Sequence, residues 1–331
     1  MKFRFSALSL CLTALVACSP QSNQNTNPSS APASGASASA SAPAAAQPTG
    51  ETVTIETARG SAQVPKNPQR IAVYDLGMLD TLDALGVHVD ATVEKLLLPN
   101  LEAAHKDRVK VGTLFDPNYE ALNAFKPDLI VIGSRTAKAF DQLNAIAPTI
   151  EMTADTKNMR VSAESRIDAF AKVFGKEKEA EALKAKIDAT FKEAKAAAEG
   201  KGKGLVILAN AGKVSAFGQD SRFGWIHKDV GVPVADSTIK EGTHGQPASF
   251  EYIKQVNPDW LFVLDRSAAI GQGDASTAAQ KVLDNPLVRE TNAWKKGQVV
   301  YLLPSNYLAA GGAQQLIDAT TQVSDALKAA K

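Results

Sequence analysis

The chain has 331 residues, of which 44% are hydrophobic and 21% are charged, and its formal net charge is +1 at pH 7. A chain of this length can form two moderate domains, each with its own hydrophobic core. It has no net basic field, which argues against nucleic acid as a partner.

The first eighteen residues have the layout of a secretory signal. Lys2 and Arg4 precede an apolar run that stops at Cys18 and is too short to cross a bilayer. The ending LVAC resembles the lipobox of bacterial lipoproteins, in which the signal is cut before a cysteine that then carries lipid. We therefore expect residues 1–17 to be a signal peptide. We expect Cys18 to carry a palmitate-type lipid that anchors the protein to a membrane, facing the periplasm of a Gram-negative bacterium. The alternative is an ordinary signal peptide that is cut nearby.

Residues 18–50 are predicted to be the lipidated cysteine followed by a flexible linker. The segment is rich in Ser, Ala, Pro and Gln, has almost no charge and contains no large apolar side chain. Such a composition cannot bury enough surface to offset the entropy of ordering. The cysteines of the chain, Cys11 and Cys18, both lie at or before its start, so the mature protein has no disulfide.

Residues 51–160 are predicted to form an N-terminal α/β lobe. From Arg70 onward, short β-branched runs such as RIAVYD and DLIVIG alternate with helical patterns, and TIEMT closes this half. Buried runs that alternate with amphipathic helices indicate a mostly parallel sheet flanked by helices.

Residues 161–200 are almost wholly helix-forming and are predicted to join two lobes by a long rigid helix. Gly175 divides the region into two helices, and Gly200 stands where a helix typically ends. We favour residues 162–174 as the helix that crosses between the lobes. The alternation resumes with LVILAN, KVSAFG, VPVAD, DWLFVLD and QVVYLLP, which predicts a C-terminal α/β lobe over residues 201–331.

Two stretches of the chain follow the same outline, one in each predicted lobe. The segments EALNAFKPDLIVIGSR and EYIKQVNPDWLFVLDR begin at Glu120 and Glu251, share a Pro-Asp pair and end on Arg135 and Arg266. The repeat predicts pseudo-symmetric lobes that face each other across a cleft.

Arginines follow several predicted strands, and ligands of parallel α/β sheets bind beyond the carboxyl ends of the strands. Arg135 and Arg266 follow the apolar runs of the repeat, and Arg222 follows KVSAFG. The planar guanidinium suits delocalised anionic oxygens. The alternative is that these arginines are surface charges paired with local acids such as Asp220 and Asp265.

Two further polar residues fall near these arginines in the predicted fold. His244 lies in the glycine-flanked loop EGTHGQP, and Tyr307 follows the strand QVVYLLP. Taken singly, such a histidine is more often a loop hydrogen-bonder, and such a tyrosine a half-buried aromatic. The other histidines fall on strand or helix patterns, and no two of the four have the i, i+4 spacing of a helical metal pair.

From about Thr52 to its end, the chain resembles the helix-linked (class III) periplasmic substrate-binding proteins of ABC importers. It is most similar to the ferric catecholate-siderophore binders of the FetB and CeuE type, which bind ferric enterobactin and related chelates. The resemblance rests on PDLIVIGSR, DSRFGWIH, GTHGQ, PDWLFVLDR and NYLAAGG, which occur in family order over both lobes.

The resemblance implies a role for each matching residue. Arg135, Arg222 and Arg266 would contact catecholate oxygens. His244 and Tyr307 would ligate Fe³⁺ where the siderophore leaves coordination sites open. A ferric tris-catecholate carries about three negative charges, which three arginines would nearly balance in a water-excluding cleft.

The resemblance also implies the partners. Glu120 and Glu251 would dock on arginines of the ABC permease dimer, one per lobe, although a carboxylate in the first turn of a helix also simply stabilises it. The protein would be a monomer that carries a ferric siderophore as cargo and has no permanent cofactor.

Other functions remain open at this point. A zinc or manganese, haem or cobalamin receptor could use the same fold. An enzyme is less well supported, because the chain lacks G-x-S-x-G, H-E-x-x-H and P-loop motifs. A hydrolase-like triad of His244 with Asp236 and Ser237 has no spacing to support it.

Overall fold

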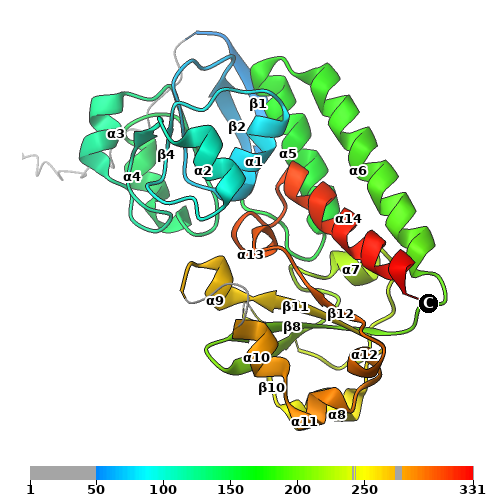
Figure 1. Ribbon diagram of the computed structural model, residues 1–331. Helices are drawn as coiled ribbons and strands as arrows, with labels where there is room; N and C mark the ends of the chain where they lie inside the picture. The colour runs from blue at the N-terminus through cyan, green and yellow to red at the C-terminus, as the bar shows by residue number, and fades with distance from the viewer. Residues whose placement is uncertain (1–49, 241, 243, 273–277, 331) are drawn as a thin grey trace, which may run out of the picture. The chain divides into compact units, whose positions relative to one another are not determined.

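The computed structural model describes residues 50–240, 242, 244–272 and 278–330. The predicted signal peptide, Cys18 and nearly all of the predicted linker lie outside these residues. Within them, two α/β lobes follow one another in the chain, as the sequence predicts (Figure 1).

The N-terminal lobe is built on a five-stranded, fully parallel sheet with the order β5-β4-β3-β6-β7. Its strands are β3 (Ile71–Val73), β4 (Ala91–Thr92), β5 (Val109–Lys110), β6 (Leu129–Ile132) and β7 (Thr149–Glu151). Its helices are α1 (Leu76–Ala84), α2 (Pro99–His105), α3 (Tyr119–Phe125), the 3-10 helix η1 (Ala137–Ala139) and α4 (Phe140–Asn144). A separate hairpin of β1 (Thr52–Thr57) and β2 (Gly60–Pro65) precedes the sheet. Because β3 and β6 are buried at every position, they read as continuous apolar runs.

Two helices lie between the two sheets in the sequence. Helix α5 (Met159–Phe174) ends at Gly175 in the left-handed conformation, and α6 (Glu177–Ala198) is followed by Gly200 with a φ of 70°. Both glycine stops therefore lie where the sequence predicts them. Helix α5 packs on β1 of the N-terminal lobe, and α6 leads into the second sheet. The crossing helix is thus α6, and our preference for residues 162–174 was wrong.

The C-terminal lobe has a mixed five-stranded sheet with the order β10-β9-β8-β11-β12. Its strands are β8 (Gly204–Asn210), β9 (Lys213–Phe217), β10 (Gln246–Ala248), β11 (Trp260–Asp265) and β12 (Val299–Tyr301). Its helices are α7 (Trp225–Lys228), α8 (Phe250–Val256), α9 (Arg266–Ala269), α10 (Ala278–Leu283), α11 (Pro286–Arg289), α12 (Asn292–Lys295), α13 (Ser305–Leu308) and α14 (Ala313–Ala329). The predicted strand VPVAD contributes only one isolated bridge, at Val234.

The repeated stretch forms the same structure in both lobes. Helices α3 and α8 end on Lys126 and Asn257, both in the left-handed conformation. The following aspartates hold the start of the neighbouring strand. Asp128 accepts hydrogen bonds from Gln69 N and Arg70 N, and Asp259 accepts one from Lys203 N. Because β6 and β11 are both the fourth strand of their sheets, the predicted pseudo-symmetry is present in this part of the fold.

The C-terminal helix α14 returns to pack on α6 and on α1 of the N-terminal lobe (Figure 1). Its first turn is capped from α1: the Thr81 hydroxyl accepts a hydrogen bond from Ala313 N, and the buried Asp80 carboxylate accepts one from Gln315 N. A side chain at Gly312 would place its Cβ 2.5 Å from Asp80 Oδ2. Glycine therefore permits this close approach between α1 and the start of α14.

Candidate ligand-binding site

A cavity of about 540 Å³ lies between the two lobes. It is lined by segments that follow β3, β6 and β7 in the N-terminal lobe, and by loops and helix α13 of the C-terminal lobe. All five residues that the sequence singles out for ligand binding line this cavity: Arg135, Arg222, Arg266, His244 and Tyr307. The structure thus brings the predicted set together, and its role in binding stays a prediction.

Arg135 reaches across from the N-terminal lobe to the segment that leads into α14. It lies in the loop after β6, is half-buried, and donates from Nη2 to the Tyr307 carbonyl at 3.0 Å and from Nη1 to the Leu308 carbonyl at 3.3 Å. Both acceptors are neutral, so the positive charge of the guanidinium is not neutralised by these contacts.

Arg266 and Tyr307 form a hydrogen-bonded pair on the opposite wall. Arg266 is the first residue of α9 and donates from Nε to the Tyr307 hydroxyl at 2.9 Å. Its Nη1 donates to Asn210 Oδ1, at the end of β8, at 3.1 Å. These contacts hold the guanidinium at the carboxyl ends of β8 and β11, as the strand-end argument predicts.

Arg222 completes the cationic cluster. Its guanidinium lies over the Tyr307 ring, 5.5 Å from the centroid. Burial lowers the pKa of Arg222, and the neighbouring charge of Arg135 lowers it further. The positive charges of Arg135 and Arg222 repel each other. Such an arrangement indicates a site in which a bound anion would balance the positive charge.

Arg222 arrives in the cavity by a different route from the one that the sequence suggested. Strand β9 is antiparallel to β8, so its carboxyl end does not lie with those of the parallel strands. Arg222 instead extends from the loop between β9 and α7, and His244 from the loop before β10. The reason we gave for placing Arg222 was therefore wrong, although the residue does line the cavity.

The local acids do not neutralise these arginines. Asp265 caps α9 by accepting a hydrogen bond from Ala268 N, and Asp220 pairs with Lys228. Among the described residues, no carboxylate forms a salt bridge within 4.0 Å of any of the three guanidinium groups. The alternative reading of simple surface ion pairs therefore loses its proposed partners.

His244 is exposed at the edge of the cavity, whereas Tyr307 is half-buried. The other histidines have structural contacts. His105 Nε2 lies 2.7 Å from Asp83 Oδ2, His227 Nδ1 lies 2.8 Å from the Val232 carbonyl, and His88 contacts Arg108. In the part of the chain that the structure describes, no three His, Cys, Asp or Glu residues form a group that could hold a metal.

The sequence reading missed a fourth arginine at the cavity. Arg166 of α5 is 4% exposed and donates from Nη2 to the Gly311 carbonyl at 2.6 Å. Its Nε and Nη1 are buried and have no hydrogen-bond partner among the residues that the structure describes. Burial lowers the pKa of Arg166 to about 10, against the opposing effect of the Asp75 charge. The only sequence signal was an arginine flanked by apolar positions of an amphipathic helix.

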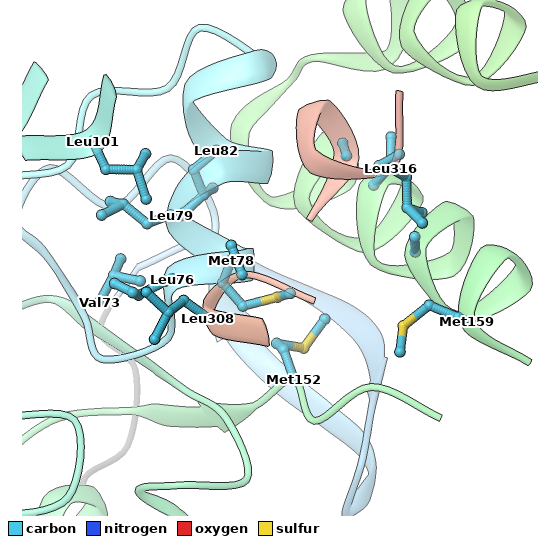
Figure 2. Close-up of a cluster of buried hydrophobic side chains, with 14 of the residues drawn as sticks. Val73, Leu76, Met78, Leu79, Leu82, Leu101, Met152, Met159, Leu308 and Leu316 are labelled. Atoms are coloured by element: carbon cyan, nitrogen blue, oxygen red, sulfur yellow. The ribbon is translucent and has the colours of Figure 1, made fainter. Parts of the chain in front are cut away.

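The N-terminal wall of the cavity also carries apolar side chains, beside polar residues such as Asp75 and Ser134. Met78 on α1, Met152 after β7 and Met159 at the start of α5 all line it, together with the exposed ring of Phe115. Figure 2 shows the three methionines in one apolar cluster with Leu308. These residues are separated in sequence, and no pattern within any one segment joins them.

Glu120 and Glu251 lie away from the cavity, as their different predicted role requires. Each is exposed in the first turn of its helix, α3 or α8, where Asn118 Oδ1 or Ser249 Oγ caps the helix. Their positions in the two lobes are equivalent, because both open the repeated stretch.

Two α/β lobes joined by a helix, with a cationic cavity between them, define a helix-linked, two-lobed binding protein. The comparisons agree with this class: the chain belongs to the periplasmic binding protein family, whose family model matches residues 71–307. No described helix combines the length and apolar character needed to span a membrane.

Known relatives of the chain are named as binding proteins for iron chelates. It is 40% identical to the petrobactin-binding protein YclQ of Bacillus subtilis over 282 aligned residues. The aligned region covers 84% of this chain and 88% of that protein. It is 35% identical to the ferric-anguibactin-binding protein FatB of Vibrio anguillarum, over 77% of this chain and 81% of that protein. The solved structure of the periplasmic catecholate-siderophore binding protein VctP of Vibrio cholerae matches with a TM-score of 0.77 and 34% identity, over 85% of this chain and 100% of that one.

Proposed function

We propose that this protein binds a ferric catecholate siderophore between its lobes and delivers it to an inner-membrane ABC importer for iron uptake. Enterobactin and its linear or bis-catecholate derivatives are the ligands that we favour. The observation that carries the proposal is the cluster of Arg135, Arg222 and Arg266 around Tyr307, without a carboxylate partner among the described residues. The ferric complex is cargo, and no permanent cofactor is needed.

The charge of the cavity suits this ligand. A ferric tris-catecholate spreads about three negative charges over its oxygens, and desolvating such an anion is costly unless opposite charges meet it. Arginine remains protonated under physiological conditions, so the three guanidinium groups supply a matching charge. The relief of repulsion between Arg135 and Arg222 would add to the binding free energy.

Tyr307 and His244 are suited to complete the coordination of iron when the chelate is bis-catecholate. Fe³⁺ is a hard cation that prefers oxygen ligands, and its charge favours loss of the phenol proton. Arg266 already donates to the Tyr307 hydroxyl and would stabilise a phenolate there. His244 is exposed at the edge of the cavity, so its imidazole is accessible to an incoming complex.

A ligand titration tests this function directly. Quenching of the intrinsic tryptophan fluorescence should saturate with ferric enterobactin and with a ferric bis-catecholate, and the bound complex should show a broad visible charge-transfer band. Haem, cobalamin and Zn²⁺ serve as competitors. Absence of quenching by both catecholates, or a Soret band from retained haem, would refute the assignment.

Tyr307→Phe and His244→Ala separate direct ligation from general packing. Both variants should weaken the bis-catecholate complex more than the hexadentate enterobactin complex, because only the former leaves iron sites open. Equal losses for the two ligands would show that these residues do not ligate iron.

Glu120 and Glu251 are proposed to dock the protein on the two halves of the permease dimer. Their exposure at equivalent places in two pseudo-symmetric lobes supports this role. The double variant Glu120→Lys/Glu251→Lys should abolish ⁵⁵Fe-siderophore uptake while leaving affinity in solution unchanged. Glu181→Lys, on the exposed side of α6, is the matched control. Normal uptake by the double variant would exclude the docking role.

We also propose that Cys18 carries the lipid that anchors the protein at the membrane facing the periplasm of a Gram-negative cell. The support is the LVAC sequence behind an apolar segment. Metabolic labelling with an alkyne palmitate should label the wild-type protein and leave Cys18→Ser unlabelled. Equal labelling of both would disprove this site.

A further inference from the structure

The methionines of this chain are concentrated at one place. The sequence contains four, of which one is the initiator. The other three, Met78, Met152 and Met159, come from separate segments and all line the cavity that holds the arginine cluster. Such a concentration in one small surface calls for a physical reason beyond core packing.

These three side chains form what we call the methionine floor. They are 1%, 3% and 3% exposed, respectively, and belong to one apolar cluster with Leu308 (Figure 2). A Cβ at Gly311 would lie 2.6 Å from Met159 Sδ, so the backbone that leads into α14 approaches the floor closely. The floor is therefore packed by residues of both halves of the chain, and only a small part of its surface faces the cavity.

Methionine differs from leucine in the two properties that matter here. Its unbranched side chain has three rotatable bonds and adapts to irregular shapes, and its polarisable sulfur makes favourable contacts with aromatic rings. Leucine or isoleucine would give a floor of fixed shape. The C-terminal wall carries Arg222 and Arg266, and Arg135 lies on the N-terminal side, so the parts of a chelate that these arginines do not hold would face the floor.

We propose that the methionine floor packs against the catechol rings and linker of the bound chelate, and lets the site accept ferric catecholates with linkers of different length. This inference rests on the proposed function. The arginines would recognise the charge that all such chelates share, while the floor repacks around the parts in which they differ.

Methyl NMR tests whether the floor contacts the ligand. The full chain is labelled with ¹³C at the methionine methyl groups and titrated with the diamagnetic Ga³⁺ complexes of enterobactin and of a bis-catecholate. Leu183→Met, on α6 and outside the cavity lining, supplies a reference methyl. All three floor methyls should shift, differently for the two chelates, while the reference stays unchanged. Binding without shifts of the floor methyls would overturn the inference.

A triple variant tests selectivity. Met78→Leu/Met152→Leu/Met159→Leu conserves volume and should fold, which the thermal unfolding transition checks. Affinity for the better-fitting chelate should change little, while affinity for the other should fall about tenfold, since each sulfur–aromatic contact is modest. A uniform change for both chelates would show that the floor does not set selectivity. If the wild-type protein bound neither chelate, the proposed function itself would fail.

Discussion

The two lobes share a scaffold and differ in the surface that they present to the cavity. Each has the same helix, Pro-Asp turn and buried strand, ending fifteen residues later on an arginine. The C-terminal lobe, however, supplies the hydrogen-bonded pair of Arg266 and Tyr307 together with Arg222. The N-terminal lobe supplies Arg135 and the methionine floor. The repeat therefore fixes where side chains emerge, whereas the loops determine which side chains line the cavity.

The difference begins with the chain that follows the third strand of each sheet. In the N-terminal lobe β3 leads into helix α1, whereas in the C-terminal lobe β8 turns back at once into the antiparallel β9. Arg222 lies in the loop that follows this hairpin, between β9 and α7. The two walls of the cavity therefore carry different side chains, although the sheets behind them are related.

The largest expected effect comes from removing the charges of the C-terminal wall. Arg222→Gln/Arg266→Gln should weaken binding of ferric enterobactin by about a thousandfold, because each lost contact with a desolvated anion is worth roughly 2 kcal/mol or more. Arg135→Gln should cost only about tenfold, since its guanidinium also binds the carbonyls of Tyr307 and Leu308. Fluorescence-quenching titrations measure both.

Arg289→Gln is the matched control for these variants, because Arg289 pairs with Asp284 on the surface. It should bind like the wild-type protein. A larger loss from Arg135→Gln than from the double variant would reverse the assignment of the walls.

The next effect is a pH dependence that belongs to the N-terminal lobe. Burial raises the pKa of Asp80 from 3.8 in the unfolded chain to about 7. Between these values the folded protein holds a proton that the unfolded chain has lost, so the free energy of unfolding falls as pH rises from about 4 to about 7. Asp80→Asn keeps an acceptor for Gln315 N. It should reduce the fall in the free energy of unfolding over this pH range by roughly 2 to 4 kcal/mol. Thermal unfolding at several pH values compares the two proteins; parallel curves would contradict the prediction.

Arg166→Met should have a smaller effect, which we predict here for stability. It removes a buried cation whose Nε and Nη1 find no partner within the described part of the chain, and it keeps the apolar volume. We expect the free energy of unfolding to rise by about 1 kcal/mol, after allowing for the lost hydrogen bond to Gly311. Chemical denaturation measures it. A marked loss of stability would mean that the charge has a partner in solution.

The smallest expected effects come from equivalent substitutions in the two copies of the repeat. Asp128→Ala and Asp259→Ala each remove the carboxylate that holds the start of the neighbouring strand, and each should lower the free energy of unfolding by about 1 to 2 kcal/mol. Similar losses in the two variants would indicate that the repeat has equal structural weight in both lobes. A loss of stability in only one variant would mean that the aspartate stabilises the fold in that lobe alone.

The parallel strands and long helices could be predicted because their signals are local. Continuous apolar runs identify β6 and β11, and the glycine stops after α5 and α6 match the structure. The position of Arg266 followed from the end of a parallel strand. The hairpin of β8 and β9 was missed, although Ala211 and Gly212, with φ angles of 48° and 79°, occupy a two-residue turn of the kind that joins antiparallel strands.

Other parts of the site could not be read from one sequence. The burial of Arg166 depends on Gly311, far along the chain, and the methionine floor joins three segments that share no local pattern. Strands of two residues, such as β4, carry too little periodicity to be detected.

The docking of α14 on α1 has a consequence for the order in which this protein can mature. The apolar faces of α1 and α6 find their partner only in the last part of the chain, where Leu316, Val323 and Leu327 are buried. Until that stretch emerges from the ribosome, the N-terminal half keeps an uncovered surface. The packing of the N-terminal half is therefore completed only after α14 has been synthesised.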